Sequence, residues 1–491
     1  MIRLLCIISV CILWPMHALA AQEILYVRPP AACANNGDGT AYGCAASPGA
    51  PGAFRTSDNI LFDTTDETAG KVDPGDLLYV CGQFIAATNG VFFYGGTLDN
   101  ENGSGTSTNR ITISFNCPGD PGSIVGSGGQ NFAWASYRSY YDLVLGAAAL
   151  TGGDINTLAI LPFSGATKNL HVTVTGGTIR DHLVVGEKCI SIVGQHVTLN
   201  GVTVTNCATD GIGVNGKYTE IKNSTISRVS QLNSNGDCIQ FSGNVDGAYI
   251  HNNICDHSDK DTKYCYLSSA SSDNGFVRIE HNTCIRPANS TTGLGILIEG
   301  SPGVILGNTI TNGYHGAICN PGAARQCDVI GNLIITPTSR GVSVGDAAST
   351  LSTVAHNTII GGATGIHFDA NAARLVTKNN ILSGQATGIN KSVAGGAPVD
   401  AYNLFYNISG NNLVVNGTPT APGPNSFLAT NPLFINAADY RLQGVSPARR
   451  TGISGQLCID VRGRACYPDT PDIGAYQATS GDPAGPRAPV Q

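Results

Sequence analysis

One phrase recurs six times along the middle of this chain: Asn253-Ile254, Asn282-Thr283, Asn308-Thr309-Ile310, Asn332-Leu333-Ile334, Asn357-Thr358-Ile359 and Asn380-Ile381. Successive copies start 29, 26, 24, 25 and 23 residues apart. A period in the twenties, with alternating apolar residues and glycines at the bends, is typical of a solenoid built from strands. The leucine-rich repeats share this period but need a Leu-x-x-Leu-x-Leu frame that is missing here. The pattern therefore predicts a right-handed parallel β-helix, whose coils stack about 4.8 Å apart.

The repeated Asn has a physical role in such a fold. Side-chain amides that stack at one bend can donate and accept hydrogen bonds along the helix axis. We therefore expect a buried row of Asn side chains that satisfy one another.

Composition excludes several classes of protein. Of 491 residues only 12% are charged, about half of the usual share, whereas 42% are hydrophobic. Such a chain buries a core and is neither disordered nor collagen-like, although it holds 62 Gly. The formal net charge of −7 offers no basic surface for nucleic acid, so we expect no DNA or RNA partner.

The first 21 residues read as a signal peptide. Arg3 is followed by an apolar run over residues 4–14, and Ala18-Leu19-Ala20 is a small-residue cleavage site. We expect a soluble, secreted protein without a membrane-inserted segment. Fourteen cysteines then remain, and an even number in an oxidising compartment favours disulfides over metal or redox roles. Four local pairs are predicted: Cys33/Cys44, Cys81/Cys117, Cys319/Cys327 and Cys458/Cys466.

A second phrase lies half a coil away from the Asn phrase and suggests where the chemistry is. Aligning its apolar pairs places one residue of each coil in a column: Lys188, Asp210, Asp237, Lys263, Leu294, His315, Arg340 and Thr364. Beside this column we expect Gln240, Ser242, Tyr264, Tyr266, Glu299 and His367. Six ionisable groups in eight coils of a low-charge chain favour a functional groove, and the alternative is a polar bend that only keeps the edge soluble.

The column supports three kinds of chemistry. Asp210 and Asp237 are expected about 5 Å apart, so they need a shared proton or a bound cation. With Ca²⁺ on the pair and Lys263 as the base, the reaction is β-elimination on a uronate. With the pair acting as acid and base, the reaction is hydrolysis of a glycosidic bond. Without catalysis, the tyrosines could form a sugar-binding surface.

The chain resembles the secreted pectin-lyase-like β-helix proteins, a superfamily of polysaccharide lyases, glycoside hydrolases, uronan epimerases and phage tailspikes. The resemblance covers residues 24–477 and is carried by three parts of the sequence. These are the opening Tyr26-Val27, Asn36-Gly-Asp-Gly-Thr40 and Gly75-Asp-Leu-Leu-Tyr-Val80, the repeated coils, and the end Asn431-Pro-Leu-Phe434, Ser446-Pro447 and Asp472-Ile-Gly-Ala-Tyr476.

Within the superfamily, the polygalacturonase-like hydrolases share the phrase around Asp210, while Gly236 before Asp237 stands where their proton donor would be. Calcium-assisted lyases on pectate or alginate use acidic ligands near a Lys or Arg base. The resemblance therefore favours a lyase with Lys263 as base, and a hydrolase is the alternative. An epimerase or a non-catalytic binder also stays open.

The remaining site residues are assigned to supporting roles. Asp256, Asp259 and Asp261 reach back toward Asp237. They are candidates for the missing proton donor, and Asp259 and Asp261 are candidate further Ca²⁺ ligands; capping of their own turn is the alternative. Tyr266 and His315 are candidate proton donors. Candidate contacts to an acidic polysaccharide are Lys188, Gln240, Tyr264, Glu299 and Arg340.

The predicted organisation has five parts. Residues 1–21 are the signal peptide, 22–130 an N-terminal cap with the first coils, and 131–400 the β-helix core. Residues 401–477 form a closing segment that folds back along the helix, and 478–491 a mobile tail.

Overall fold

The computed structural model describes residues 22–29, 32–33, 35, 37–46, 53, 72–85, 106–126, 132–136, 139–152, 156–161, 169–232, 235–243, 246–261, 263–269, 275–322, 325–345, 352–369, 375–392, 399–455, 457–467 and 469–477. The predicted signal peptide and tail lie outside the described residues. The predicted domain boundaries stay predictions.

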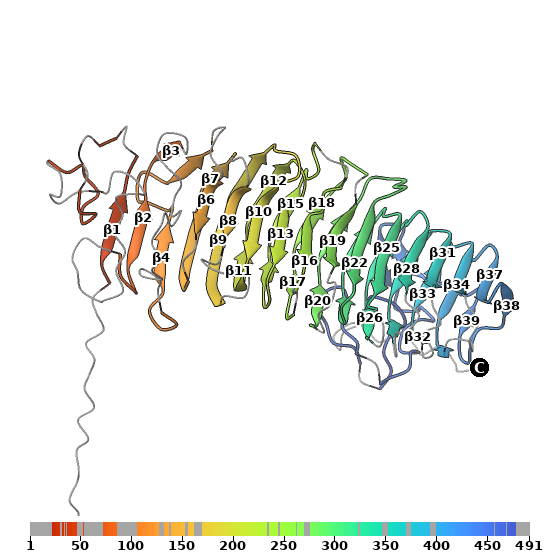
Figure 1. Cartoon of the computed structure of the whole chain (residues 1–491). Coiled ribbons are helices and arrows are strands. Elements are labelled where there is room, and N and C mark those ends of the chain that lie inside the picture. Colours follow the sequence, from red (N-terminus) through yellow and green to blue (C-terminus); the bar gives the residue numbers. More distant parts are fainter. Residues whose placement is uncertain are drawn as a thin grey trace, which may run out of the picture.

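The described chain is all β and winds into stacked coils with three sides (Figure 1). One side is a 13-stranded sheet. Its strands are β6 (Phe132–Ser136), β8 (Asn156–Ile160), β10 (Lys188–Val193), β13 (Ile212–Asn215), β16 (Ile239–Ser242), β19 (Tyr264–Ser269), β22 (Leu294–Glu299), β25 (His315–Asn320), β28 (Arg340–Val344), β31 (Thr364–Phe368), β34 (Thr387–Lys391), β37 (Asn411–Val415) and β38 (Thr418–Thr420). All neighbours pair in parallel except β37 and β38, a closing hairpin.

A 26-stranded sheet covers the other two sides, because β7 (Tyr141–Thr151) and β9 (Asn169–His182) run through the bend between them. The second side holds β1 (Ile24–Val27), β2 (Leu77–Val80), β4 (Ile111–Ser114), β11 (Gln195–Asn200), β14 (Glu220–Lys222), β17 (Tyr249–His251), β20 (Val277–Glu280), β23 (Gly303–Leu306), β26 (Cys327–Ile330), β29 (Ser352–Ala355), β32 (Leu375–Lys378) and β35 (Val399–Ala401). The third side holds β3 (Gln83–Ile85), β5 (Ser123–Val125), β12 (Thr203–Cys207), β15 (Thr225–Ser227), β18 (Ile254–Asp256), β21 (Thr283–Ile285), β24 (Thr309–Thr311), β27 (Leu333–Ile335), β30 (Thr358–Ile360), β33 (Ile381–Ser383), β36 (Leu404–Tyr406) and β39 (Phe427–Leu428).

The expected row of asparagines is confirmed at the bend between the second and third sides. Each side-chain amide donates from Nδ2 to Oδ1 of the next Asn at 3.0–3.1 Å, and the same Oδ1 accepts the backbone N–H of the preceding Asn. The row runs from Asn253 to Asn403, and every member is at most 1% exposed. The residue before each Asn of the row has a left-handed φ, for example +66° at Gly331 and +58° at Asn379. This backbone conformation turns the chain sharply at the bend.

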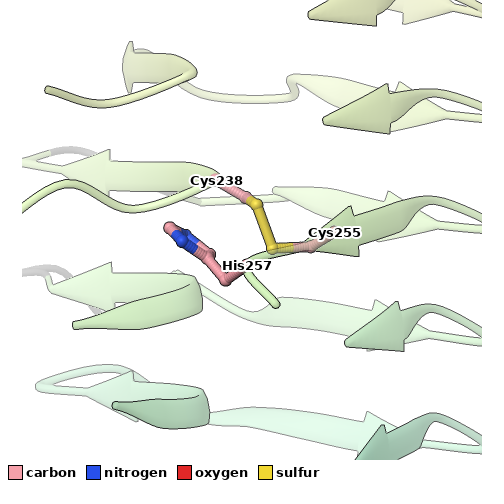
Figure 2. A group of neighbouring side chains, drawn as sticks. All are labelled: Cys238, Cys255 and His257. Carbon is pink, nitrogen blue, oxygen red and sulfur yellow. A yellow bond between two sulfur atoms is a disulfide. The ribbon is translucent and has the colours of Figure 1, made fainter. Parts of the chain in front are cut away.

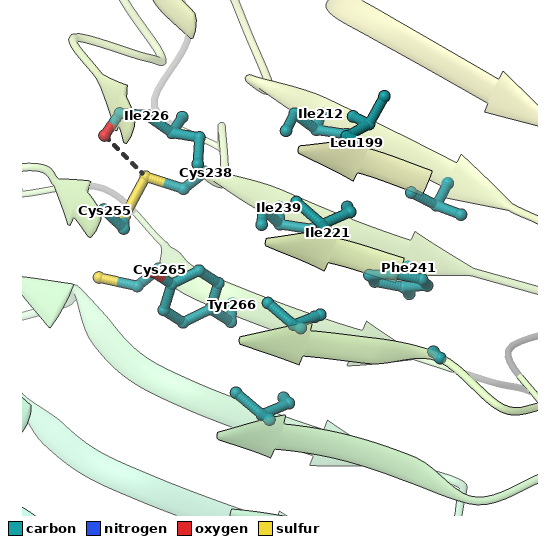
Figure 3. Packing of buried hydrophobic residues seen from close by; sticks show 14 of the residues in the cluster. Leu199, Ile212, Ile221, Ile226, Cys238, Ile239, Phe241, Cys255, Cys265 and Tyr266 are labelled. Atoms are coloured by element: carbon teal, nitrogen blue, oxygen red, sulfur yellow. Dashed lines mark hydrogen bonds between the residues drawn. A yellow bond between two sulfur atoms is a disulfide. The ribbon is translucent and has the colours of Figure 1, made fainter. Parts of the chain in front are cut away.

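Stacked columns of Ile, Val, Leu and Phe fill the interior (Figure 3). Ile212 and Ile239 pair directly across neighbouring coils, and both are fully buried. Burial of each such side chain contributes ~1.5–3 kcal/mol, so the core is the main stabilising term. No helix in the described part of the chain is long and apolar enough to cross a membrane.

The interior corner between the 13-stranded sheet and the third side is filled either by a disulfide or by a Gly packed against an apolar side chain. All four predicted disulfides are confirmed, and three more, Cys189–Cys207, Cys238–Cys255 and Cys265–Cys284, join the 13-stranded sheet to the third side within one coil. In the coils after Cys265 a Gly takes the place of the first Cys, and an aliphatic residue or Phe405 takes the place of the second. Gly341 thus faces Ile359.

We expect Gly341→Ala to destabilise the protein by about 1–3 kcal/mol, because the added Cβ would lie 2.4 Å from Ile359 Cγ2 and 2.7 Å from the carbonyl oxygen of Gly365. Gly43→Ala is the matched control, since a Cβ at Gly43 would meet no heavy atom within 4 Å and φ there is not left-handed. Chemical denaturation of both variants measures the difference, and equal stabilities would contradict the packing argument.

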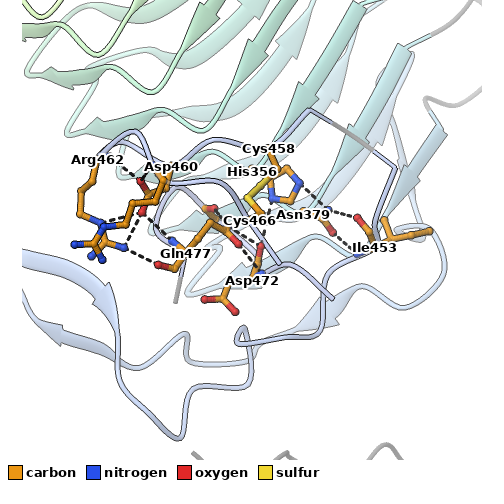
Figure 4. The surroundings of a disulfide bond; sticks show 11 residues. His356, Asn379, Ile453, Cys458, Asp460, Arg462, Cys466, Asp472 and Gln477 are labelled. Atoms are coloured by element: carbon orange, nitrogen blue, oxygen red, sulfur yellow. Dashed lines mark hydrogen bonds and ion pairs between the residues drawn. A yellow bond between two sulfur atoms is a disulfide. The ribbon is translucent and has the colours of Figure 1, made fainter. Parts of the chain in front are cut away.

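The C-terminal segment packs back against the second side, below the coils in Figure 1. Ile459 covers Val304, Leu306 and Ile330, and the hairpin of β40 (Phe434–Asn436) and β41 (Asp439–Leu442) precedes it. His356 joins this segment to the coils (Figure 4): its Nδ1 lies 3.3 Å from the Asp472 carbonyl oxygen, and its Nε2 lies 3.1 Å from Asn379 Nδ2. The Asn379 amide also forms two hydrogen bonds with the backbone of Ile453. The imidazole is therefore needed in its neutral form.

Acid is expected to weaken this attachment. Burial lowers the pKa of His356 to about 4, whereas an unfolded histidine titrates near ~6.5. The contribution of His356 to the free energy of unfolding is thus complete above about pH 6.5 and declines as the pH falls toward 4, by about 3 kcal/mol. Denaturation of wild type and His356→Gln at several pH values tests this. We expect their stability difference to shrink in acid, and a constant difference would contradict it.

Candidate functional site

The outer face of the 13-stranded sheet carries the predicted column, with one correction. Ile239 pairs with Tyr266, so Tyr264 and not Lys263 follows Asp237 in the column. The observed order is Lys188, Asp210, Asp237, Tyr264, Leu294, His315, Arg340 and Thr364. The alignment was wrong by one residue because it placed Cys265 in the inward position of Ile239, whereas Cys265 is equivalent to Cys238 and the buried Tyr266 takes the position of Ile239.

Asp210 and Asp237 lie on adjacent coils, as predicted, and both are buried. Asp210 Oδ1 accepts the backbone N–H of Asp237 at 2.9 Å, and Asp237 Oδ1 accepts that of Tyr264 at 2.9 Å. Asp210 Oδ2 is 3.9 Å from Lys188 Nζ. The pair is only 3% and 1% exposed, so each carboxyl group caps the next coil much as the Asn row does.

Burial raises the pKa of both carboxyl groups. For Asp237, burial and the neighbouring Asp210 raise the pKa well above its ordinary value, against the opposing effects of the Tyr264 N–H and Lys263. For Asp210, burial outweighs the Asp237 N–H, Lys188 and Lys263. Asp237 Oδ2 has no hydrogen-bond partner within the described residues, which fits a protonated carboxyl group. Lys263 itself is exposed beside the pair.

Tyr266 does not reach the groove. Its ring is fully buried in the core, where the hydroxyl donates to backbone carbonyl oxygens of Asn253 or Thr283 at 3.4 and 3.2 Å. Burial raises its pKa far above the ordinary value. The prediction of Tyr266 as a proton donor facing the substrate is therefore wrong about its position, because the inward corner holds a ring that sequence alternation placed outside.

Within the described residues, no three of the four carboxylates predicted to hold Ca²⁺ bring their oxygens within 4.8 Å of one another. Asp261 Oδ2 accepts the N–H groups of Thr291 and Thr292, and its Oδ1 accepts the Gly293 N–H at 2.8 Å and the Ser290 hydroxyl. Although burial alone would raise it, these hydrogen bonds lower the pKa of Asp261 to about 2. Asp259 accepts from Gln231 Nε2 at 3.0 Å. Asp256 caps its own turn at Ser258.

No described group of three metal-binding side chains includes these aspartates. The two groups within the described ranges are Cys238, Cys255 and His257, and His356, Cys458 and Cys466. In each group the two cysteines form a disulfide, so they offer no thiolate. Figure 2 shows the first of these groups. The residues present do not fit the predicted calcium site.

A second polar cluster lies farther along the same face, and the sequence indicated it only in part. It contains His315, Arg340, Ser343, His367 and Asp369, which we call the His–Arg–Asp cluster. Asp369 Oδ2 lies 2.7 Å from Arg340 Nη1 and 3.2 Å from Ser343 Oγ. Asp369 Oδ1 is 2.6 Å from His367 Nε2.

The Arg340–Asp369 ion pair of this cluster is open to solvent, unlike the Asp pair, whereas Ser343 and His367 are buried. The side chains of Arg340 and Asp369 are 29% and 43% exposed. Although burial raises it, the charges of His367 and Arg340 hold the pKa of Asp369 below its ordinary value. The sequence analysis did not name Asp369 as a site residue, because it lies one residue beyond the end of the β31 strand pattern. Once the register is known, Asp369 is level with Gly345 and Ser392 on the neighbouring coils, and this position places it on the outer face.

Of the two imidazoles in this cluster, His315 is the one that belongs to the column. It pairs in register with Arg340 on the next strand. Burial, followed by the charge of Arg340, lowers the pKa of His315 to about 4, so it is neutral at pH 7. Its Nδ1 is buried without a hydrogen-bond partner among the described residues, and the ring lies against Tyr314 with centroids 4.5 Å apart.

The other predicted contacts occupy the same face. Gln240 lies on the outward side of β16, and Glu299 is exposed at the end of β22. Tyr264 is half-buried, and burial together with the charges of Asp237 and Glu299 raises its pKa. His315 is three coils from Asp237, about 14 Å, so the two clusters form separate parts of one face.

Comparison with known proteins supports the fold. Residues 164–334 match a family model described as "Right handed beta helix region". With the parallel pairing of the coils, this makes the chain a right-handed parallel β-helix protein, the fold expected from the pectin-lyase-like superfamily. No curated protein matches the chain.

Several solved structures are similar at low identity. The pectate lyase Pel9A is 13% identical, with 94% of this chain and 97% of that chain covered and a TM-score of 0.39. An alginate lyase from Paenibacillus sp. str. FPU-7 is 14% identical, with 66% and 91% covered and a TM-score of 0.30. The tailspike protein of E. coli bacteriophage HK620 is 12% identical, with 70% and 59% covered and a TM-score of 0.36.

Proposed function

We propose that this protein is a secreted enzyme that cleaves an acidic, uronate-containing polysaccharide by β-elimination, with the chemistry at His315 and Arg340. One observation carries the proposal: on an open sheet face, a neutral imidazole lies one coil from a guanidinium. β-Elimination on a uronate needs this combination, a base for the proton next to the carboxylate and a cation for the carboxylate itself. Secretion rests on the seven disulfides, which form in oxidising compartments.

The reaction balances with these two groups. Arg340 binds the uronate carboxylate and stabilises the negative charge that develops on it. His315 takes the proton from the carbon beside the carboxylate. The electron pair of that C–H bond forms the new C=C bond as the glycosidic C–O bond breaks, and water at the open face protonates the leaving oxygen.

Substrate binding also activates the base. The charge of Arg340 is the second cause that lowers the pKa of His315. A carboxylate paired with Arg340 compensates that charge, so the pKa of the imidazole rises toward neutrality in the complex. Asp369 holds Arg340 in place meanwhile, and its own charge acts in the same direction on His315.

The residues around the Asp pair have supporting roles in this proposal. Lys188 and Lys263 are cations along the same face and bind further carboxylates of the polymer. Asp210 and Asp237 are too buried to touch a sugar, and they fix the backbone between these cations. Lys263, which the sequence favoured as the base, thus becomes a binding residue. No step uses Ca²⁺, because the predicted ligands are committed to turns and backbone caps.

Hydrolysis at the Asp pair is a second candidate, favoured by one observation. The pKa of Asp237 is raised more strongly than that of Asp210, which lies near Lys188. This difference suits Asp237 as the proton donor and Asp210 as the proton acceptor. This candidate requires that the surrounding turn opens, since Asp237 is 1% exposed.

The test incubates purified mature protein with pectate, alginate, glucuronan and bacterial exopolysaccharides, with and without a chelator. We expect growing ultraviolet absorbance from the new C=C–carboxylate group, unchanged by the chelator. Loss of the signal with chelator would contradict the metal-free mechanism. Growth of reducing ends without ultraviolet absorbance would move the assignment to hydrolysis, and no cleavage of any polymer would overturn the proposed function.

A further inference from the structure

Four aromatic rings are stacked on successive coils at the bend between the 13-stranded sheet and the second side. They belong to Tyr140, His171, His196 and Tyr218, and we call them the ring stack. Neighbouring ring centroids lie 4.6, 4.4 and 4.8 Å apart, and the ring planes differ by only 12–19°. All four residues have a left-handed φ, between +51° and +58°. One backbone conformation therefore directs all four rings along the same row.

The ring stack joins coils at a place where the backbone pairing is interrupted. Between β9 and β11 the register shifts from Gln195 to Val197, beside the two histidines. Contacts between the stacked rings stabilise the bend at this point. The Asn row lies at the next bend of the coil and begins only at Asn253. The bends of the N-terminal coils therefore depend on rings, whereas the later coils are held by side-chain amides.

The surroundings of the ring stack oppose its protonation. Burial, followed by the charges of His196 and Arg110, lowers the pKa of His171 below its ordinary value. Arg110 is itself paired with Asp142 on β7, at 2.7 Å. In the described part of the chain, no carboxylate is hydrogen-bonded to either imidazole of the stack. A proton that the stack takes up therefore meets no compensating negative charge.

At the other end of the stack the nearest carboxylate is already paired. Asp246 Oδ2 lies 3.9 Å from Lys217 Nζ and accepts the Tyr218 hydroxyl at 3.4 Å. A first proton on one imidazole is tolerated, since the neighbouring rings attract a cation. A second proton would place two imidazolium rings face to face, 4.4 Å apart. Like charges this close repel strongly, because stacked faces leave no room for water between them.

We propose that the ring stack is an acid-sensitive clamp on the N-terminal coils. Near neutral pH it holds together the bends that lead into β7, β9, β11 and β14, and in acid the doubly protonated stack opens them. The Asn row contains no group that ionises, so the coils that it holds stay closed. The solenoid therefore loosens first in its N-terminal half.

The clamp also affects the groove on the 13-stranded sheet, and this effect alone rests on the proposed function. The bends of His196 and Tyr218 directly follow β10 and β13. Lys188, the first residue of β10, belongs to the polar column and binds a carboxylate of the polymer in the proposed function. Opening of the clamp in acid therefore removes the Lys188 end of the groove from substrate binding.

Hydrogen exchange of the mature protein, followed by mass spectrometry, tests the clamp at about pH 7.5 and about pH 4.5, on either side of the ordinary pKa of histidine. Exchange rates are converted to protection factors, which removes the intrinsic effect of pH on exchange. The double variant His171→Tyr/His196→Tyr keeps four rings and removes both protonation sites. Tyr140 and Tyr218 show that a tyrosine fits this backbone position. His281→Asn is the matched control, since His281 also has a left-handed φ, +52°, but lies outside the stack.

In the wild type we expect the amides of β9, β11 and β14 next to the stack to lose protection about tenfold or more in acid, whereas those of β21, β24 and β27 beside the Asn row keep it. The double variant should show no such loss, and His281→Asn should behave like the wild type. No acid loss in the wild type, an equal loss in the double variant, or a loss spread over the whole chain would overturn the clamp.

The single variant His196→Tyr keeps the test decisive if the double variant does not fold. It leaves one imidazole, so two like charges cannot meet, and its acid loss should be smaller than that of the wild type. A loss as large as in the wild type would overturn the clamp. If the wild type cleaves no polymer at either pH while the variants still suppress the acid loss, the proposed function fails and the clamp stands.

Discussion

His315→Ala is expected to lower kcat/KM on the preferred polymer by about 10²–10⁴-fold, the usual contribution of a general base. The reason is geometric, because His315 is the neutral imidazole in register with the cation that binds the carboxylate. Arg340→Lys should raise KM and lower kcat, since an ammonium group cannot bind a carboxylate in the bidentate manner of a guanidinium. Initial rates from the ultraviolet absorbance of the product measure both effects.

The pH dependence gives an independent check on this assignment. The base works only unprotonated, so kcat/KM of the wild type should be constant near neutrality and fall as the pH drops through about 4. Asp369 raises the pKa of His315, so Asp369→Asn should move this acid limb to lower pH. His251→Ala on the second side is the matched control and should keep full activity. A fully active His315→Ala enzyme would refute the role of this residue.

Asn332→Leu is expected to lower the free energy of unfolding by about 3–5 kcal/mol. Asn332 Oδ1 accepts the backbone N–H and the side-chain Nδ2 of Asn308, and its own Nδ2 donates to the carbonyl oxygens of Ile305 and Ile330 and to Asn357 Oδ1. A leucine has a similar volume but leaves these buried partners unsatisfied, and each costs about 1–3 kcal/mol.

Asn411→Leu is the control for this substitution. Asn411 begins β37 with its side chain exposed, so its replacement should change stability by less than about 0.5 kcal/mol. Urea denaturation followed by circular dichroism measures both variants. Equal midpoints for the two leucine variants would show that the Asn row contributes little, contrary to its buried hydrogen bonds.

The sequence predicted the coils and the Asn row because both depend on a local pattern that repeats once per coil. It also predicted the disulfides whose partners belong to neighbouring turns, such as Cys319–Cys327, only eight residues apart. It did not pair Cys238 with Cys255, because their contact crosses the interior of a coil, and only the winding of the chain determines which residues meet there.

The sequence predicted which face of the solenoid carries the polar column, but it did not predict which side chains contact one another there. Residue type and spacing placed Asp210, Asp237, His315 and Arg340 correctly in one column. The register of β19 decided that Tyr264 follows Asp237, because the buried Tyr266, and not Cys265, pairs with Ile239. Sequence periodicity did not reveal this register, since Cys265 and Tyr266 are both able to fill an inward position and a slip of one residue exchanges them.

What the sequence by itself determined is therefore the solenoid, its polar face and its low charge, because these follow from periodicity and composition. Burial was decided only by the tertiary structure. It enclosed the Asp pair and Tyr266, left Arg340 and Asp369 open to solvent, and stacked the rings of His171 and His196 on one another. The physical reason is that exposure and charge proximity depend on which coils and segments stack on one another, and a one-dimensional pattern does not contain those distances.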